Sequence, residues 1–216
     1  MTDTKGKVYI VGGGPGDPEL LTLKAKRIIE SADLVIFADS LVPPEIVEFA
    51  KESAQVIGSK ELNLDEIMEL ELTAVREGKN VARVQSGDPS IYGAILEQMR
   101  ILDKEGIDFE IIPGVSAAFA AAAVLRSELT VPEKSQTVIL TRMEGRVAMP
   151  EGEQLKDLAA HGCTMVIFLS ITRMTKVVRE LTSSGYTEDT PVAVVYRVGW
   201  PDELVIRGTL KDIAGK

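Results

Sequence analysis

Short apolar runs rich in β-branched residues alternate with helix-like stretches along the whole chain. In 91–104, for example, Ile91, Ile95 and Met99 recur at helical spacing and share one face. Strands that alternate with helices are typical of parallel sheets, so the pattern predicts an α/β fold. The expected strands are 8–11, 34–37, 55–57, 81–84, 109–112, 137–140, 165–169, 192–196 and 205–207. The expected helices are 20–30, 64–76, 91–104, 117–123, 153–160 and 174–183.

The pair Pro113-Gly114 interrupts this pattern directly after a strand. We therefore expect two α/β lobes, one over 1–112 and one over 113–216, with a ligand crevice where the strand ends converge. The strands at 192–196 and 205–207 are expected to pair across the loop that contains Trp200. A single open sheet of nine or ten strands is the alternative, although twisted sheets of that size are uncommon.

Composition excludes several classes of protein. The 216 residues are 45% hydrophobic and 26% charged, which is ordinary for a globular chain, and no apolar run is long enough for a membrane span. The only cysteine, Cys163, cannot form an internal disulfide, so we expect a cytoplasmic protein. With Cys163 and His161 as the single residues of their types, we expect no all-protein zinc site, no catalytic Cys/His pair and no metal.

The net charge of −9 is unevenly distributed. Residues 1–112 contain 12 basic and 21 acidic residues, whereas 113–216 contain 12 of each. No basic cluster is present, so we expect no nucleic-acid partner. Most cations of the second half are arginines, which suit bidentate binding of carboxylates. These arginines are Arg126, Arg142, Arg146, Arg173, Arg179, Arg197 and Arg207.

The glycine-rich run Gly-Gly-Gly-Pro-Gly-Asp-Pro at 12–18 follows the first strand. It does not fit a dinucleotide or P-loop motif, because Asp17 stands where a third glycine belongs and no Gly-Lys-Ser/Thr follows. Pro15 also removes a main-chain N–H that a phosphate would need. The run instead provides bare main chain for close approach by a ligand or by the other lobe.

Two further loops follow strands, at 86–93 and at 112–118. Asp88 in the first of them either contacts a ligand or caps the helix expected at 91–104. Because all three strand-end loops lack phosphate-binding features, they indicate a pocket for a neutral or cationic small molecule.

The order of these motifs resembles the tetrapyrrole methylase family. The resemblance rests on the Gly-x-Gly-Pro-Gly-Asp-Pro run, on Phe-Ala-Asp-Ser-Leu-Val at 37–42, on Gly-Asp-Pro at 87–89 and on Pro-Gly-Val-Ser at 113–116, and it spans nearly the whole chain. It implies two α/β/α lobes with S-adenosylmethionine bound in the cleft between them. Within the family, 84–99, 141–146 and 195–203 are most similar to the branch that methylates carbon 11 of precorrin-4 or cobalt-precorrin-4 in cobalamin biosynthesis.

The resemblance also implies roles for residues by position. Asp39 and Lys60 align with an acid/base pair proposed in uroporphyrinogen-methylating relatives, and Asp88 would orient the methionine amino group or face the sulfonium. Arg142 and Arg146 are the candidate partners for the carboxylates of a precorrin. The implied cofactor contacts are Pro15, Ser86, Gly87, Asp88, Ile91, Ser116, Ala117, Leu169 and Val198.

The function expected from the resemblance is S-adenosylmethionine-dependent C-methylation of precorrin-4 by a homodimer. One alternative keeps the fold and changes the substrate to another precorrin position, uroporphyrinogen III or a protein-bound diphthamide precursor. A second alternative is a non-catalytic ligand-binding module. Family members continue beyond the position of Lys216, so we expect a C-terminal lobe that is shortened at its end.

Overall fold

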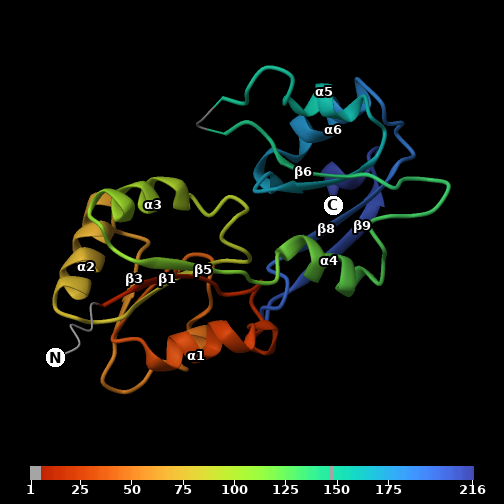
Figure 1. Cartoon of the computed structure of the whole chain (residues 1–216). Coiled ribbons are helices and arrows are strands. Elements are labelled where there is room, and N and C mark those ends of the chain that lie inside the picture. The colour runs from red at the N-terminus through yellow and green to blue at the C-terminus, as the bar shows by residue number, and fades with distance from the viewer. Residues whose placement is uncertain (1–5, 146–147) are drawn as a thin grey trace. The chain divides into compact units, whose positions relative to one another are not determined.

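A computed structural model describes residues 6–145 and 148–216, and they form two compact units (Figure 1). The N-terminal unit contains the described residues up to Ala120 together with Arg197–Asp202. The C-terminal unit contains the described parts of Ala121–Tyr196 and Glu203–Lys216. The division thus falls after Ala120, where we expected it after residue 112, and the return of Arg197–Asp202 to the N-terminal unit was not expected.

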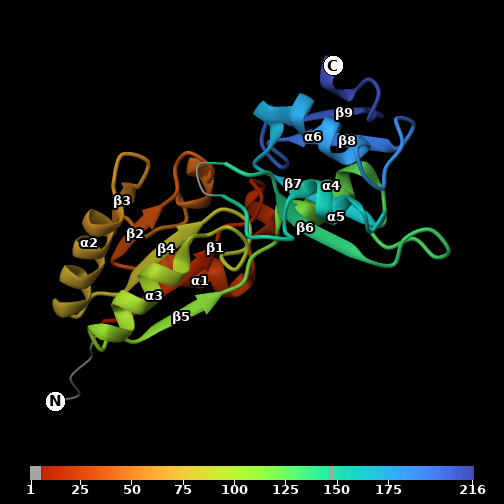
Figure 2. The same ribbon diagram turned by 90° about the horizontal axis from the view of Figure 1, so that it is seen from above.

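The N-terminal unit is built on one five-stranded parallel sheet, and Figure 2 shows its strand order β3-β2-β4-β1-β5. The strands are β1 Val8–Gly12, β2 Leu34–Phe37, β3 Gln55–Gly58, β4 Val81–Gln85 and β5 Phe109–Ile112. Because parallel strands run in the same direction, their carboxyl ends share one edge of the sheet. The loops that follow β4, β1 and β5 are therefore neighbours.

Helices cover both faces of this sheet, with α1 on one face and α2 and α3 on the other (Figure 1). Their bounds are α1 Leu23–Ser31, α2 Leu64–Arg76 and α3 Ile95–Lys104. Thr22 begins α1, because its Oγ1 accepts a hydrogen bond from the Ala25 N–H at 3.1 Å. Asn63 and Glu66 form a capping box that begins α2. A fourth helix, α4 Ala117–Leu125, carries the chain out of the N-terminal unit.

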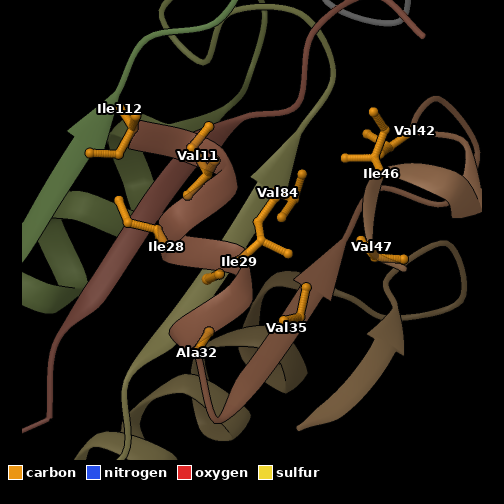
Figure 3. Close-up of a cluster of buried hydrophobic side chains, with 12 residues drawn as sticks. Val11, Ile28, Ile29, Ala32, Val35, Val42, Ile46, Val47, Val84 and Ile112 are labelled. Carbon is orange, nitrogen blue, oxygen red and sulfur yellow. The ribbon is translucent and has the colours of Figure 1, made fainter. Parts of the chain in front are cut away.

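The core of the N-terminal unit follows the alternation of side chains along the strands. Figure 3 shows the cluster on the α1 face, to which Val11, Val35 and Val84 of three strands and Ile29 of α1 belong. Val8, Ile10, Leu34, Ile36 and Val81 point to the opposite face and pack with α2 and α3. Burial on both faces explains why β1 and β2 are nearly continuous apolar runs rather than alternating ones.

The C-terminal unit contains two small sheets. In the first, β6 and β7 are parallel, and in the second, β8 and β9 are antiparallel, which confirms the expected hairpin. Among the described residues the strands fall into three sheets, so the alternative of one open sheet is wrong. Buried Leu155, Ala159, Val177 and Leu181 pack the two helices together. The elements are β6 Val138–Arg142, α5 Leu155–Ala159, β7 Thr164–Phe168, α6 Met174–Thr182, β8 Pro191–Tyr196 and β9 Leu204–Thr209.

Two helix starts differ from expectation by more than two residues. A 3-10 turn at Pro18–Leu20 precedes α1, so the helix begins at Leu23 and not at residue 20. α3 begins at Ile95 and not at residue 91, because Tyr92 and Ala94 have φ of 56° and 51° and cannot belong to a right-handed helix.

Across the two described stretches, no helix combines the length and the apolar character needed to cross a membrane. Nor does the described part of the chain contain a group of three or more His, Cys, Asp or Glu residues arranged to hold a metal ion.

Candidate functional site

Three loops meet at the carboxyl edge of the N-terminal sheet. We call residues 13–18 the first loop, residues 86–94 the second loop and residues 113–116 the third loop; they follow β1, β4 and β5. Main-chain hydrogen bonds join the first two: the Gly13 N–H donates to the Gln85 carbonyl at 2.7 Å, and the Gly87 N–H donates to the Gly14 carbonyl at 2.8 Å. The strand-end loops that the sequence predicted are thus in direct contact.

Glycines allow the main chains of the loops to approach closely. A Cβ on Gly12 would lie 2.5 Å from the Gly114 nitrogen, and a Cβ on Gly114 would overlap the Gly87 carbonyl oxygen. At Gly12 and Gly114 the space is therefore filled by neighbouring loops. Gly87 differs, because its φ is +64° and an added Cβ would have no neighbour nearer than the Ser116 Cα at 3.7 Å. Bare main chain at Gly87 is not explained by loop packing alone.

Asp88 links the second loop to the third. Its Oδ2 accepts a hydrogen bond from the Gly114 N–H at 2.9 Å, and its Oδ1 accepts from the Ser90 N–H at 2.9 Å and from the Ser90 hydroxyl. Partial burial raises the pKa of Asp88, but the hydrogen bonds from Ser90 and Gly114 outweigh it, so the pKa lies below its ordinary value. The alternative that Asp88 caps α3 is wrong, because the residue at the N-cap of α3 is Ala94.

The second loop continues through an irregular segment before α3. Tyr92 and Ala94 both have positive φ, which costs a non-glycine residue on the order of 1 kcal/mol each. Ile91 lies half-buried within this segment. Surrounding structure must hold these two residues in place, so the segment is a fixed turn rather than an extension of the helix.

Ser116 ends the third loop and begins α4. Its side chain is buried, and its Oγ accepts a hydrogen bond from the Ala118 N–H at 3.3 Å. Its carbonyl accepts from the Phe119 and Ala120 amides at 3.1 Å and 3.2 Å. Ser116 and half-buried Ala117 are thereby fixed beside Gly87.

The returning segment Arg197–Asp202 packs against the first loop. A Cβ on Gly16 would overlap the Trp200 ring and would lie 2.9 Å from the Val198 carbonyl oxygen. The Arg197 guanidinium stacks on the Trp200 ring, 3.8 Å from its centroid, and its Nε lies 3.1 Å from Asp202 Oδ1. The structure thus brings Val198 to the first loop, which also contains buried Pro15. Apart from the glycines of the first loop, nothing in the sequence predicted that Arg197–Asp202 packs against this loop.

Asp39 and Lys60 lie together after β2 and β3, at the same edge of the sheet. The Lys60 N–H donates to Asp39 Oδ1 at 2.7 Å, and a Cβ on Gly58 would lie 2.7 Å from the Asp39 carboxyl carbon. Both residues are exposed, and the Lys60 ammonium lies 3.9 Å from the Glu61 carboxylate. The predicted pair is therefore brought together through a main-chain amide.

The remaining candidates belong to the C-terminal unit. Arg142 is the last residue of β6 and is half-buried, and it pairs in register with Phe168. Leu169 follows β7 with a φ of 54° and a relative exposure of 67%. Arg146 lies outside the described residues. The structure describes these positions within their own unit and does not relate them to the three loops.

Comparison with known proteins places these features in a family context. Residues 7–214 match the family model described as Tetrapyrrole (Corrin/Porphyrin) Methylases. The chain is 58% identical over 214 residues to the cobalt-precorrin-4 C(11)-methyltransferase of Methanocaldococcus jannaschii, covering 99% of this chain and 83% of that protein. It is 51% identical over 209 residues to the precorrin-4 C(11)-methyltransferase of Pseudomonas aeruginosa, covering 97% and 83%.

Solved structures agree with the sequence comparison. The X-ray structure of a cobalamin biosynthetic enzyme, the cobalt precorrin-4 methyltransferase CbiF, is similar with a TM-score of 0.92 at 51% identity, covering 95% of this chain and 86% of that one. The uroporphyrin-III C-methyltransferase of Thermus thermophilus, complexed with S-adenyl homocysteine, is similar with a TM-score of 0.81 at 27% identity, covering 97% and 86%.

Proposed function

This chain belongs to the tetrapyrrole methylase family, and from that premise we propose that it transfers the methyl group of S-adenosylmethionine to carbon 11 of precorrin-4 or cobalt-precorrin-4 in cobalamin biosynthesis. The observation that carries the proposal is the identity of 58% to a cobalt-precorrin-4 C(11)-methyltransferase over 99% of this chain. Uroporphyrinogen III is the weaker substrate candidate, because a methyltransferase for it in Methanosarcina barkeri is only 38% identical.

S-adenosylmethionine fits the chemistry of the three loops. The cofactor has an ammonium group and a sulfonium centre but no phosphate, and the three loops, residues 13–18, 86–94 and 113–116, contain no lysine or arginine. The low pKa of Asp88 keeps a negative charge at the junction of the second and third loops. The open side of Gly87 leaves main chain available for close approach. The residues proposed to hold the cofactor are Pro15, Ser86, Gly87, Asp88, Ile91, Ser116, Ala117, Leu169 and Val198.

The reaction makes modest demands on side chains. When bound, the cofactor supplies an electrophilic methyl group, and an electron-rich carbon of the macrocycle is the nucleophile. The protein therefore contributes chiefly by aligning the two, and alignment alone is worth several kcal/mol. The hydrogen-bonded loop junction suits this role, because Asp88 and the Gly13–Gln85 bond fix three main-chain segments relative to each other.

We further propose that Asp39 and Lys60 act as an acid/base pair during the reaction. Both side chains are exposed at the edge of the sheet that carries the loops, and the 2.7 Å hydrogen bond from the Lys60 amide orients the Asp39 carboxylate. In the C-terminal unit, Arg142 is the proposed partner of a substrate carboxylate, together with Arg146. The family resemblance also leads us to propose a homodimer, which sedimentation analysis would test.

Two measurements test the function directly. Calorimetry with S-adenosylhomocysteine should show binding at one site per chain, and absence of binding would leave only a non-catalytic role. Incubation with precorrin-4 or cobalt-precorrin-4 and methyl-labelled S-adenosylmethionine should place label on carbon 11 of the macrocycle. Uroporphyrinogen III serves as the competing substrate, and faster labelling of it would overturn the assignment. The ratio of rates with and without cobalt identifies the natural form of the substrate.

A further inference from the structure

Two ionisable residues are buried in the N-terminal unit away from the three loops. Glu71 of α2 has a relative exposure of 0% and Arg83 of β4 one of 5%. In the part of the chain that the structure describes, neither carboxylate oxygen of Glu71 has a hydrogen-bond partner, and neither does Nε of Arg83. Buried charges of this kind are rare and costly for a fold, so their presence calls for a reason.

The Arg83 guanidinium joins the ends of β2 and β3. Its Nη1 donates to the Ser59 hydroxyl at 3.2 Å and to the Ile36 carbonyl at 3.4 Å. Ser59 in turn donates through its N–H and its hydroxyl to the Phe37 carbonyl, at 2.9 Å and 3.1 Å. One guanidinium therefore supports both strand ends from inside the protein.

These strand ends lead directly to the proposed acid/base pair. Lys60 follows Ser59, and its amide holds the Asp39 carboxylate at 2.7 Å. Burial lowers the pKa of the Arg83 guanidinium, whereas the negative charges of Glu71 and Asp39 both raise it. Burial raises the pKa of Glu71 to about 7, and Arg83 acts against that shift.

We propose that Arg83 is a positioning residue for methyl transfer, which holds the ends of β2 and β3 so that Asp39 and Lys60 are presented together. This inference rests on the function proposed above for Asp39 and Lys60. It assigns to Arg83 no contact with substrate or cofactor. Its effect passes through Ser59 and the strand ends.

The test compares Arg83→Met in the wild-type and in the Asp39→Asn background. In the wild-type background we expect kcat for the precorrin substrate to fall about tenfold or more, with the Kd of S-adenosylhomocysteine within about twofold of wild type. In the Asp39→Asn background Arg83→Met should have little further effect on kcat. Equal losses of kcat in both backgrounds, or parallel losses of kcat and cofactor affinity, would overturn the proposal. Arg76→Met is the matched control, because Arg76 is an exposed guanidinium of α2 paired with Glu105 at 2.9 Å.

A double variant keeps the test interpretable if Arg83→Met does not fold. Glu71→Leu/Arg83→Met replaces both buried ionisable side chains with apolar ones, so that neither is left buried without the other. It should fold and still have reduced kcat; a folded double variant with wild-type kcat would refute the positioning role.

Amide hydrogen exchange separates this inference from the function itself. In the folded double variant the Lys60 amide should exchange about tenfold faster or more, because its hydrogen bond to Asp39 is no longer held in place. The Thr209 amide, which donates to Asp212 Oδ1 at 2.7 Å in the C-terminal unit, should be unchanged. If the wild-type protein does not methylate precorrin-4, the proposed function fails. The exchange rate of the Lys60 amide then decides whether Arg83 holds the strand ends: faster exchange in the double variant supports that role, and unchanged exchange refutes it.

Discussion

Gly87→Ala is the most informative single substitution, because it separates cofactor contact from backbone strain. Gly87 lies in the second loop with a φ of +64° and no atom within 3.7 Å of an added Cβ. Gly106, in the turn between α3 and β5, has a φ of +66° and open space on the side of an added Cβ. The two glycines therefore have nearly the same positive φ, and only one of them lies in the proposed site.

The expected cost to stability is the same for both alanine variants. An alanine in the left-handed region is disfavoured by about 1–2 kcal/mol, and the loss of unfolded-state entropy returns about 0.4–1 kcal/mol. Each variant should therefore lose about 1 kcal/mol of unfolding free energy, with no added term for steric overlap. Urea denaturation followed by circular dichroism measures this loss.

The effect on binding should differ. If cofactor lies against the bare main chain of Gly87, the new methyl group displaces it, and we expect the Kd of S-adenosylhomocysteine to rise about tenfold or more, equivalent to about 1.4 kcal/mol. Gly106→Ala should bind as wild type does, as calorimetry would report. Equal affinities for the two variants would show that Gly87 serves only the turn, and the proposed cofactor site would have to be abandoned.

Three further predictions concern other parts of the chain. Because the pKa of Glu71 rises from 4.5 to about 7 on folding, its contribution to stability is complete below pH of about 4.5 and is lost as the pH rises through about 7. Between pH 4.5 and pH 8 the unfolding free energy of the wild type should fall by about 3 kcal/mol relative to that of Glu71→Gln, in which this titration is absent. Denaturation of both proteins across that pH range measures the difference, and parallel curves would contradict the prediction. Trp200→Ala should cost about 2 kcal/mol of stability and weaken S-adenosylhomocysteine binding, because the ring packs on Gly16, whereas Trp200→Phe should retain most of both. Arg142→Ala should raise KM for the precorrin substrate more than the Kd of S-adenosylhomocysteine, and equal losses would argue against a substrate-carboxylate role.

The sequence predicted the arrangement of the loops because strand order and loop position are both consequences of apolar patterning. Short runs rich in β-branched residues at 81–84 and 109–112, which alternate with helix-like stretches, indicated parallel strands, and parallel strands place their following loops at one edge. The structure confirms these runs as β4 and β5 on either side of β1. The resemblance supplied what patterning does not, namely the cofactor and the substrate.

The start of α3 was not predictable from periodicity. Ile91 has the same spacing to Ile95 and Met99 that a helical residue would have, yet it lies in a turn. The left-handed backbone at Ala94 prevents the helix from beginning earlier than Ile95, and an alanine does not predict that conformation. The spacing of apolar residues indicates that they could share one face of a helix, but it does not determine the backbone angles of the residues between them.

Glycine in the three loops shows where reasoning from sequence reaches its limit. A bare main chain is equally useful to a ligand and to a neighbouring loop, and residue type cannot distinguish the two. The structure does distinguish them: an added Cβ at Gly12 or Gly114 meets main chain, at Gly16 it meets Trp200, and at Gly87 it meets only ordinary van der Waals contacts. Most of these glycines therefore exist so that loops and the returning segment can pack together. Gly87 alone among these four keeps an open side that packing does not account for, which is why the argument for a cofactor site depends on it.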